Sequence, residues 1–338
     1  MIATDPAIRV LIPPDVQPDF DGLEGELMDF SGRCMGTRWS VRVVCTHAAL
    51  AGQAEAGVAL ILETIEAQMS HFREHSALRR FARSIRGDWM ELPPEFARVM
   101  QTALEIARAS QGAFDPTLGD AVDAWGFGAA RHFSDPDFVP PAQNTAPRRA
   151  DWARLVLDER HRLLQPGGVS LNLSAIAKGF AVDAVSEYLC RLGLVNHLVE
   201  VGGELRGVGM KPDFQPWWVA LEQPAADCSL PATRIALHGL AVATSGDYRR
   251  RYLAGGKHLQ HTLDPATGAP VVHSLASVTV IHEECMRADA WATALMVLGP
   301  RSGLALAESL GLRALLQWKN DKDEWVELAS TAFKALQQ

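Results

Sequence analysis

The residue types most suggestive of chemistry lie in an apolar stretch near the end of the chain, residues 288–297 (ADAWATALMV). Asp289 and Thr293 are four residues apart, so on a helix their side chains share one face. A carboxylate in an apolar helix must be paired, hydrogen-bonded or metal-bound, because burying it alone costs several kcal/mol. A carboxylate and a hydroxyl are hard oxygen donors that suit Mg²⁺ bridging a phosphorylated ligand. We expect a metal site here; the alternative is that Asp289 is the N-cap or first-turn anion of the helix.

A second segment, residues 172–179 (NLSAIAKG), has the composition of a phosphate-binding turn. We expect a strand over Val169–Leu173 that leads through small residues into a helix. Backbone N–H groups at the start of that helix would suit a phosphate, and Lys178 adds a positive charge. The glycine spacing of a Walker A motif is absent. Lys178 could equally be a solvated lysine on the helix surface.

Two aromatic residues between glycines follow a turn-rich segment in the first half of the chain. Residues 112–117 (GAFDPT) precede residues 125–128 (WGFG). Asp115 is followed by proline, which disfavours the helical conformation and leaves its carboxylate on extended or turn backbone. Trp125 and Phe127 could form a stacking wall for a flat ligand. They could equally plug the core after a turn.

A histidine and a carboxylate three residues apart stand in another turn-rich segment, residues 261–270 (HTLDPATGAP). An unperturbed histidine titrates at about pH 6.5, which suits a general base. His261 could also be a loop histidine that caps a turn. Met35-Gly36-Thr37 precedes a predicted strand, where a strand-entry turn is the simpler interpretation.

These segments must be positioned by the periodic elements between them. Apolar residues alternate over 39–45, which is typical of a strand, and recur at helical spacing over 54–70. Helices and strands mix without a regular βαβ period, so we predict an α+β fold. The predicted strands are 39–45, 169–173, 197–201, 217–222, 235–243 and 277–281, and the predicted helices are 54–70, one after Pro94, 174–192, 287–298 and 303–310.

The chain is expected to form one main domain after a short arm. Residues 1–25 are acidic and contain four prolines, so we expect them to be an extended N-terminal arm. We interpret residues 26–338 as one domain with two sublobes. A proline-rich excursion at 131–150 lacks periodic apolar residues and is expected to be a surface loop or a crossing between the sublobes.

Composition excludes several classes of protein. The chain has 338 residues, of which 48% are apolar and 21% charged, so it has enough apolar sequence for a sizeable core and is not a disordered chain. A net charge of −8 argues against nucleic acid as the main partner. The five cysteines form no C-x-x-C pair, which indicates neither a zinc ribbon nor a disulfide framework and favours a reduced compartment. Without a signal peptide pattern or an apolar run of about 18 residues, we expect a cytoplasmic protein with no membrane span.

Taken in order, these segments resemble the ApbE-type FAD:protein FMN transferases. The resemblance extends from about Met35 to Gly299, and the ordered set is far more specific than any single motif. It rests on residues 35–37, 69–70, 112–117, 125–128, 176–183 (IAKGFAVD), 201–204 (VGGE), 244–248 (TSGDY), 261–270 and 288–293.

The resemblance implies mixed or antiparallel sheets with helices packed against them and two lobes around a flavin-nucleotide cleft. It also implies an enzyme that requires Mg²⁺, splits FAD, attaches the FMN half through a phosphoester bond to a threonine of a target protein, and releases AMP. His261 matches the general base, and Asp264 would orient it. Ala175 (through its carbonyl), Asp289 and Thr293 match the metal ligands. The positions that match flavin-nucleotide contacts are Met35, Phe72, Ala113, Phe114, Asp115, Asn172, Lys178 and Leu263.

Three features depart from the family pattern. Asn172 stands where an aspartate is common, so a neutral amide that still accepts and donates replaces an anion. Phe72 stands where a tyrosine is usual, so stacking survives without the hydroxyl contact. Many relatives are exported lipoproteins, whereas this sequence shows no export signal or lipobox cysteine.

Three other functions stand beside FMN transfer. Some family members mainly hydrolyse FAD to FMN and AMP, which makes an FAD pyrophosphatase the first. The second is a flavin-binding or trafficking protein without catalysis, and the third is a scaffold that binds no FAD. The pair formed by Asp289 and Thr293, together with His261, counts against the last two.

Overall fold

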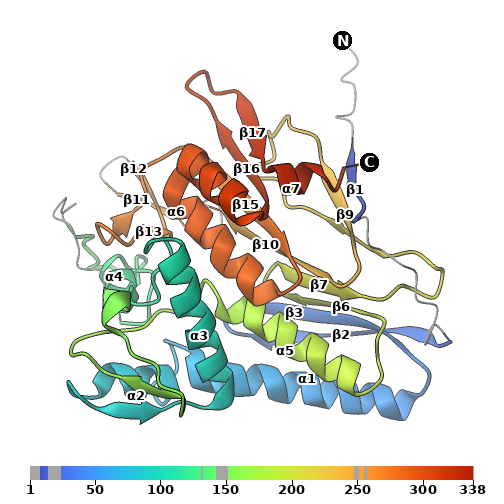
Figure 1. The fold of residues 1–338 in the computed structure, drawn as a ribbon, viewed down its shortest axis with the longest axis horizontal. Helices are drawn as coiled ribbons and strands as arrows, with labels where there is room; N and C mark the ends of the chain where they lie inside the picture. Colours follow the sequence, from blue (N-terminus) through green and yellow to red (C-terminus); the bar gives the residue numbers. More distant parts are fainter. Residues whose placement is uncertain are drawn as a thin grey trace.

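The main feature of the fold is an eight-stranded sheet covered by helices on one face (Figure 1). The computed structural model describes residues 8–13, 24–130, 132–141, 151–246, 251–254 and 257–337. The strands of this sheet are β2 (Glu26–Cys34), β3 (Thr37–Cys45), β6 (His197–Val201), β7 (Glu204–Val208), β10 (Leu240–Gly246), β15 (Leu275–His282), β16 (Arg313–Lys319) and β17 (Trp325–Ala329). Their order is β17-β16-β15-β10-β7-β6-β3-β2, and every neighbouring pair is antiparallel. The predicted α+β class is therefore confirmed, with an antiparallel sheet.

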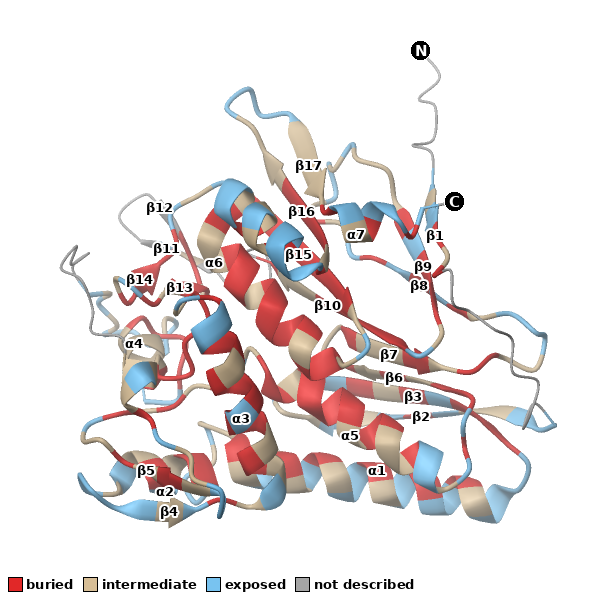
Figure 2. Cartoon of the chain, viewed as in Figure 1, coloured by how far each residue is buried: buried red, intermediate tan, exposed pale blue. Residues whose placement is uncertain are grey.

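Five helices form the layer on that face: α1 (Ala48–Met69), α2 (Ala77–Arg83), α3 (Pro94–Ala109), α5 (Ala177–Arg191) and α6 (Cys285–Leu310). α5 and α6 pack on the central strands, α1 lies along α5, and α3 contacts α1 and α6 (Figure 1). Figure 2 shows buried residues concentrated along α5 and α6. Val58, Leu62, Ile65 and Met69 of α1 are buried at helical spacing, which confirms the predicted period, although the helix begins earlier than expected.

A second, smaller core covers the other face of the sheet. It is built by β1 (Arg9–Leu11), β8 (Trp217–Ala220) and β9 (Thr233–Leu237), which form a three-stranded sheet, and by α7 (Thr331–Lys334). In β10, Ala241 and Ala243 face the helical core while Val242 faces the second core. The central strands are therefore buried on both faces. Residues 9–11 of the expected N-terminal arm pair in parallel with β9.

The remaining elements are short. Three strand pairs lie outside the two larger sheets: β4 (Trp89–Glu91) with β5 (Arg162–Leu164), β11 (Arg251–Ala254) with β12 (Lys257–Gln260), and β13 (Leu263–Asp264) with β14 (Ala269–Pro270). The other short elements are α4 (Gly119–Ala124) and the 3₁₀ helix η1 (Asp151–Arg154). Of the proline-rich excursion, residues 132–141 form turns and irregular backbone, and residues 131 and 142–150 lie outside the described chain.

Several predicted boundaries are wrong for identifiable reasons. Val169, Leu171 and Leu173 are buried, but residues 169–173 form no strand; the N–H of Asn172 donates to the carbonyl of Pro116 at 2.8 Å outside any ladder. The predicted strand 235–243 is two strands, because Gly239 turns the chain with a φ of 70°. The helix predicted at 174–192 begins only at Ala177. The two helices predicted at 287–298 and 303–310 are the two parts of α6, which is interrupted at Gly299 just before Pro300.

One helix is apolar enough to cross a membrane by length and composition alone, namely α1, within the part of the chain that the structure describes. Its buried face, which includes Ala54, Val58 and Ile65, packs into the same core as α5. The expectation of no membrane span stays a prediction.

Candidate active site

A cavity of about 370 Å³ lies at one end of the large sheet, where the β2–β3 and β6–β7 turns meet the end of β10. Segments far apart in the sequence, including the end of α1, the start of α5 and the middle of α6, contribute to its lining. The cavity brings together every predicted site residue except Asp264: Met35, Phe72, Ala113, Phe114, Asp115, Asn172, Ala175, Lys178, His261, Leu263, Asp289 and Thr293. From the 244–248 motif, Thr244, Ser245 and Gly246 line it, while Asp247 and Tyr248 lie outside the described residues.

Asp289 lies in the second turn of α6 and is only 4% exposed. Its Oδ2 accepts a hydrogen bond from the backbone N–H of Gly179 at 3.1 Å. One turn later, Thr293 Oγ1 lies 3.0 Å from Ser245 Oγ at the end of β10. Both residues line the cavity, so the predicted shared face of the helix is confirmed. The alternative that Asp289 is the N-cap or a first-turn anion is wrong, because Glu284 occupies the N-cap position and the first turn of α6 carries no acidic residue.

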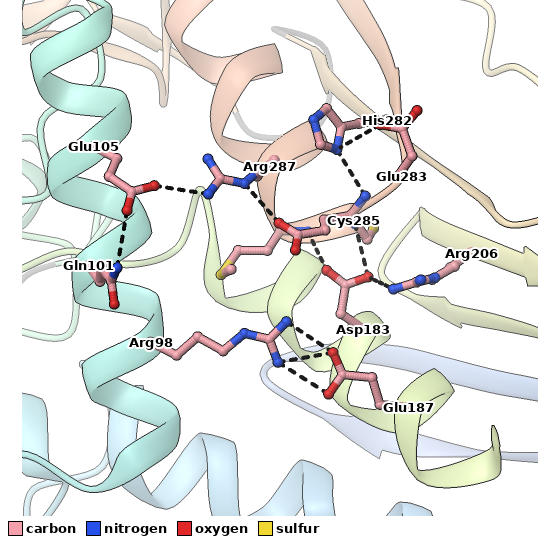
Figure 3. Close-up of polar contacts among 12 residues, drawn as sticks. Arg98, Gln101, Glu105, Asp183, Glu187, Arg206, His282, Glu283, Cys285 and Arg287 are labelled. Atoms are coloured by element: carbon pink, nitrogen blue, oxygen red, sulfur yellow. Dashed lines mark hydrogen bonds and ion pairs between the residues drawn. The ribbon is translucent and has the colours of Figure 1, made fainter. Parts of the chain in front are cut away.

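A buried carboxylate, Asp183, holds the N-terminus of α6 against α5 (Figure 3). Its two oxygens accept hydrogen bonds from the N–H groups of Cys285 at 3.0 Å and Met286 at 2.8 Å, and Arg206 of β7 pairs with it at 2.6 Å. Burial raises the pKa of Asp183, an effect that the Arg206 charge and the two N–H groups oppose. One turn earlier on α5, a Cβ at Gly179 would lie 2.4 Å from the carbonyl oxygen of Cys285, so only glycine permits this helix crossing. The crossing fixes the direction in which the second turn of α6 enters the cavity.

Two ion pairs join α3 to the same helices (Figure 3). Arg98 pairs with Glu187 of α5 at 2.9 Å, and Glu105 pairs with Arg287 of α6 at 2.9 Å. These side chains are partly exposed, and such pairs typically contribute only about 0–1 kcal/mol. We therefore attribute the geometry of α5 and α6 mainly to Asp183 and the glycine contact.

Lys178 lines the cavity from the first turn of α5 and forms an ion pair with Glu204 of β7, which is 2% exposed. Its Nζ also lies 4.0 Å from Asp289 Oδ2. The alternative that Lys178 is a solvated surface lysine is therefore wrong. Glu204 and Asp183 were not predicted as site residues. Each is nevertheless the last residue of a motif noted in the sequence: Glu204 of 201–204 and Asp183 of 176–183.

Among the described residues that line the cavity, four are acidic, namely Glu66, Asp115, Glu204 and Asp289, whereas Lys178 is the one lysine or arginine. Burial raises the pKa of the Cys285 thiol well above its ordinary value, and the charges of Asp183, Glu204 and Asp289 raise it further, while Lys178 lowers it. A surplus of carboxylate charge in a buried site favours a cation.

The oxygen atoms at the floor fit Mg²⁺. Asp289 supplies a carboxylate, Thr293 and Ser245 supply hydroxyls, and Ala175 lies on the turn before α5, all of them lining one cavity. In the described chain no three His, Cys, Asp or Glu side chains lie close enough to hold a metal. A metal here would therefore depend on one carboxylate, on neutral oxygens and on oxygens of the ligand, which suits the binding of Mg²⁺ together with a phosphorylated substrate.

The backbone N–H groups before α5 are less available than expected. The N–H groups of Ile176 and Ala177 both donate to the carbonyl of Leu173, at 3.1 and 2.9 Å. The amide oxygen of Asn172 accepts the N–H of Ser174 at 2.9 Å, so this neutral residue shapes the turn as an aspartate would. The prediction that these N–H groups are available to a phosphate is therefore wrong, because each already donates within the protein.

His261 and Asp264 have different surroundings. His261 lines the cavity beside Phe127, with ring centroids 6.3 Å apart in an edge-on arrangement. Asp264 Oδ1 accepts the N–H of Ala266 at 2.9 Å, and Oδ2 lies 3.4 Å from Thr267 Oγ1. The carboxylate of Asp264 thus closes the turn between β13 and β14.

Trp125 and Phe127 are both buried in one small hydrophobic cluster, and a stacking role for Phe127 stays a prediction. Trp125 is 4% exposed and donates its Nε1–H to the carbonyl of Gly268 at 2.7 Å, so it plugs the core. Phe127 is buried but also lines the cavity. Phe72 also lines the cavity, and its 57% exposure places it at the entrance.

Asp115 is buried and accepts hydrogen bonds from Thr117, from the N–H at 2.8 Å and from Oγ1 at 2.5 Å.

Known proteins are similar to this chain over most of its length. The ApbE family model matches residues 35–316. The FAD:protein FMN transferase of Vibrio cholerae is 34% identical over 317 residues, covering 91% of this chain and 92% of that protein. The enzyme of the same name from Haemophilus influenzae is 34% identical over 325 residues, covering 93% and 92%.

Solved structures show the same relationship. The apo form of the Pseudomonas stutzeri flavinyl transferase ApbE has a TM-score of 0.81 at 34% identity, covering 92% of this chain and 96% of that one. The flavin transferase ApbE of Vibrio cholerae has a TM-score of 0.80 at 33% identity, covering 92% and 99%. The residues matched by the family model include all those that line the cavity, and the chain belongs to the ApbE family.

Proposed function

We propose that this protein transfers the FMN half of FAD to a threonine hydroxyl of a target flavoprotein and releases AMP. The observation that carries the proposal is the meeting of Asp289, Lys178 and His261 in one cavity, which supplies a metal ligand, a phosphate-binding cation and a base. The relatives named FAD:protein FMN transferase support it, because they match this chain over nine-tenths of both lengths.

The cavity suits a flavin nucleotide. Its volume of about 370 Å³ falls within the range of roughly 300–1,000 Å³ for small-molecule sites. Phe127, Phe72 and Met35 offer apolar surface to a flat ring, and Lys178 offers a positive charge to phosphate oxygens. Glu204 holds the lysine within reach of the cavity floor.

Asp289, Thr293 and the carbonyl of Ala175 would hold Mg²⁺. When bound, the ion supplies charge neutralisation to the pyrophosphate and to the departing AMP. Ser245 fixes the Thr293 hydroxyl, and Gly179 fixes one oxygen of Asp289, so the protein oxygens are positioned before any ligand enters.

In the transfer, the phosphoryl group of the FMN half passes from AMP to the acceptor threonine. The acceptor threonine oxygen forms a bond to the phosphorus of the FMN half, the bond from that phosphorus to the oxygen of AMP breaks, and AMP leaves with the electron pair. An imidazole nitrogen of His261 takes the threonine proton. Most of the catalytic effect then comes from positioning and charge neutralisation, as is general for phosphoryl transfer.

Mass spectrometry of a target flavoprotein incubated with this protein, FAD and Mg²⁺ tests the proposal. We expect one threonine peptide heavier by an FMN phosphoester, AMP release that matches it, and no modification when EDTA removes the metal. AMP release at the same rate without the target would identify a pyrophosphatase instead. Tight FAD binding with no AMP under either condition would identify a flavin carrier.

A further inference from the structure

Glu66, near the C-terminal end of α1, lines the cavity and contacts the turn that joins β2 to β3. Its Oε1 accepts the backbone N–H of Met35 at 3.0 Å, and its Oε2 lies 3.5 Å from Cys34 Sγ. Arg73, in the segment after α1, pairs with the same carboxylate. One side chain therefore ties together two segments of the cavity wall that are far apart in sequence.

The turn that Glu66 holds has an unfavourable backbone conformation. Met35 has a φ of 53°, followed by Gly36 with a φ of 71°. A non-glycine residue in the left-handed region costs on the order of 1 kcal/mol and persists only where its surroundings restrain it. A hydrogen bond from its N–H to a carboxylate is such a restraint, because bonds to charged groups are among the strongest in proteins.

Cys34 adds a second contact between the same turn and α1. Burial and the Glu66 charge raise the pKa of the Cys34 thiol to about 12, so the thiol stays protonated. Its Sγ lies 3.4 Å from the carbonyl oxygen of Leu62 as well as near Glu66. The S–H group therefore acts as a donor that draws the end of β2 onto α1.

The second segment that Glu66 holds carries Phe72. Ser70 Oγ accepts the N–H groups of Phe72 at 3.1 Å and Arg73 at 3.2 Å, which makes a tight turn after α1. The Arg73 guanidinium pairs with both Glu63 and Glu66, and of these two carboxylates only Glu66 also accepts the Met35 N–H and so links this turn to the Met35 turn.

We propose that Glu66 is a positioning residue for FAD, which holds the Met35 turn and the Phe72 turn at the separation that admits the flavin nucleotide. This rests on the proposed function, in which Met35 and Phe72 contact FAD. The oxygens of Glu66 accept from donors of the protein itself, so its effect falls on FAD binding and not on the bond-breaking step.

Three variants test this: Glu66→Ala, Glu66→Gln and the matched control Glu63→Gln. Glu63 lies one turn earlier on α1, pairs with the same Arg73, and is not among the cavity-lining residues. The FAD Kd is measured by quenching of flavin fluorescence with EDTA present, and kcat is measured from AMP release with Mg²⁺ at saturating FAD. Thermal unfolding confirms that each variant is folded at the assay temperature.

Loss of a hydrogen bond to a charged group predicts that Glu66→Ala raises the FAD Kd at least about tenfold, with kcat within about twofold of wild type. Glu66→Gln keeps an oxygen that accepts the Met35 N–H, so its FAD Kd rises only about threefold. Glu63→Gln leaves both values unchanged.

An unchanged FAD Kd in Glu66→Ala would overturn the proposal, and so would an equal loss in Glu63→Gln, or a loss of kcat at an unchanged Kd. If Glu66→Ala does not fold, the test is the FAD Kd of Glu66→Gln compared with that of Glu63→Gln: an equal Kd in the two variants would overturn the proposal. A wild-type protein that binds FAD but never modifies a target would refute the proposed transfer while leaving this comparison of Kd values valid.

Discussion

At the residue scale, the cavity uses side chains whose positions are already fixed by their neighbours. The hydroxyl of Thr293 is held by Ser245, and the carboxylate of Asp289 by the N–H of Gly179. Preorganised groups of this kind lose little entropy when a ligand binds. Removing one of their oxygen atoms should therefore lower the affinity for the ligand directly.

Thr293 provides the cleanest test of the metal site, because two variants differ in one functional group. Thr293→Val keeps the shape and removes the hydroxyl, while Thr293→Ser keeps the hydroxyl. Loss of outer-shell partners costs roughly 10- to 100-fold in metal affinity, so loss of a direct oxygen ligand should weaken binding at least about tenfold. Mn²⁺ binding followed by electron paramagnetic resonance measures this. Equal affinities in the two variants would remove Thr293 from the ligand set.

His261 and Asp264 are expected to behave differently. His261→Ala should lower transfer about 100-fold while FAD binding stays constant, because general-base groups contribute roughly 10²–10⁴-fold. Asp264→Asn keeps the oxygen that accepts the Ala266 N–H, so we expect transfer within about threefold of wild type. Stopped assays of FMN transfer over a range of pH make the comparison. A tenfold loss in Asp264→Asn, with a shifted pH profile, would assign that carboxylate to the orientation of His261.

At the element scale, the site depends on how closely α5 and α6 cross. The carboxylate of Asp183 on α5 accepts N–H groups of α6, and the N–H of Gly179 on α5 donates to Asp289 on α6. The two helices are thus joined by reciprocal contacts one turn apart. Any change that separates them should displace Asp289 and Thr293, the proposed metal ligands.

Gly179→Ala tests the crossing. The added methyl would lie 2.4 Å from the carbonyl oxygen of Cys285 and 2.8 Å from the Cα of Met286, both backbone atoms. Overpacking of this kind typically costs about 1–3 kcal/mol, and Mg²⁺ binding should weaken with it. Gly52→Ala in α1 is the control, because nothing lies within 4 Å there. Urea unfolding should show the control more stable than wild type by about 0.5–1 kcal/mol. Gly179→Ala with wild-type stability and metal binding would contradict the argument.

At the scale of the whole molecule, the large sheet separates two cores and carries the cavity at one end. The helical core holds α5 and α6 in place on one face, and the small sheet with α7 supports the other. Polar contacts also cross between layers. His197 of β6 is fully buried, lies 2.8 Å from Ser186 Oγ of α5 and bonds to the carbonyl of Leu194.

This histidine should make global stability depend on pH. Burial lowers the pKa of His197 from 6.5 to about 4, against the raising effect of the Leu194 carbonyl. The unfolded chain therefore binds the proton first as pH falls, so the stabilisation is complete above about pH 6.5 and is lost toward pH 4. The loss from this residue should be about 3 kcal/mol. Urea unfolding of wild type and His197→Gln from pH 7 to pH 4 measures it, and we expect the difference between the two to shrink with falling pH. A constant difference would contradict the assignment.

The sequence could predict the parts of the fold that depend on local periodicity. The apolar spacing of α1 and the alternation of β3 identify those elements, because each buries one face along its own length. The same reasoning failed for residues 169–173, since a buried irregular segment is as apolar as a strand. It also predicted a single strand over 235–243, although a turn at Gly239 separates two strands there.

By itself, the sequence predicted most of the residues that line the cavity and that we propose carry the chemistry. Asp289 and Thr293 stand out because polar side chains four residues apart in an apolar stretch need a partner. Only the tertiary structure decided which distant residues support the cavity-lining residues: Glu204 pairs with Lys178, 26 residues away, and Glu66 accepts the N–H of Met35, 31 residues away. The local sequence around a glutamate does not show whether its side chain is solvated or buried against a distant partner. Its role follows from the path of the chain in space, which local spacing does not encode.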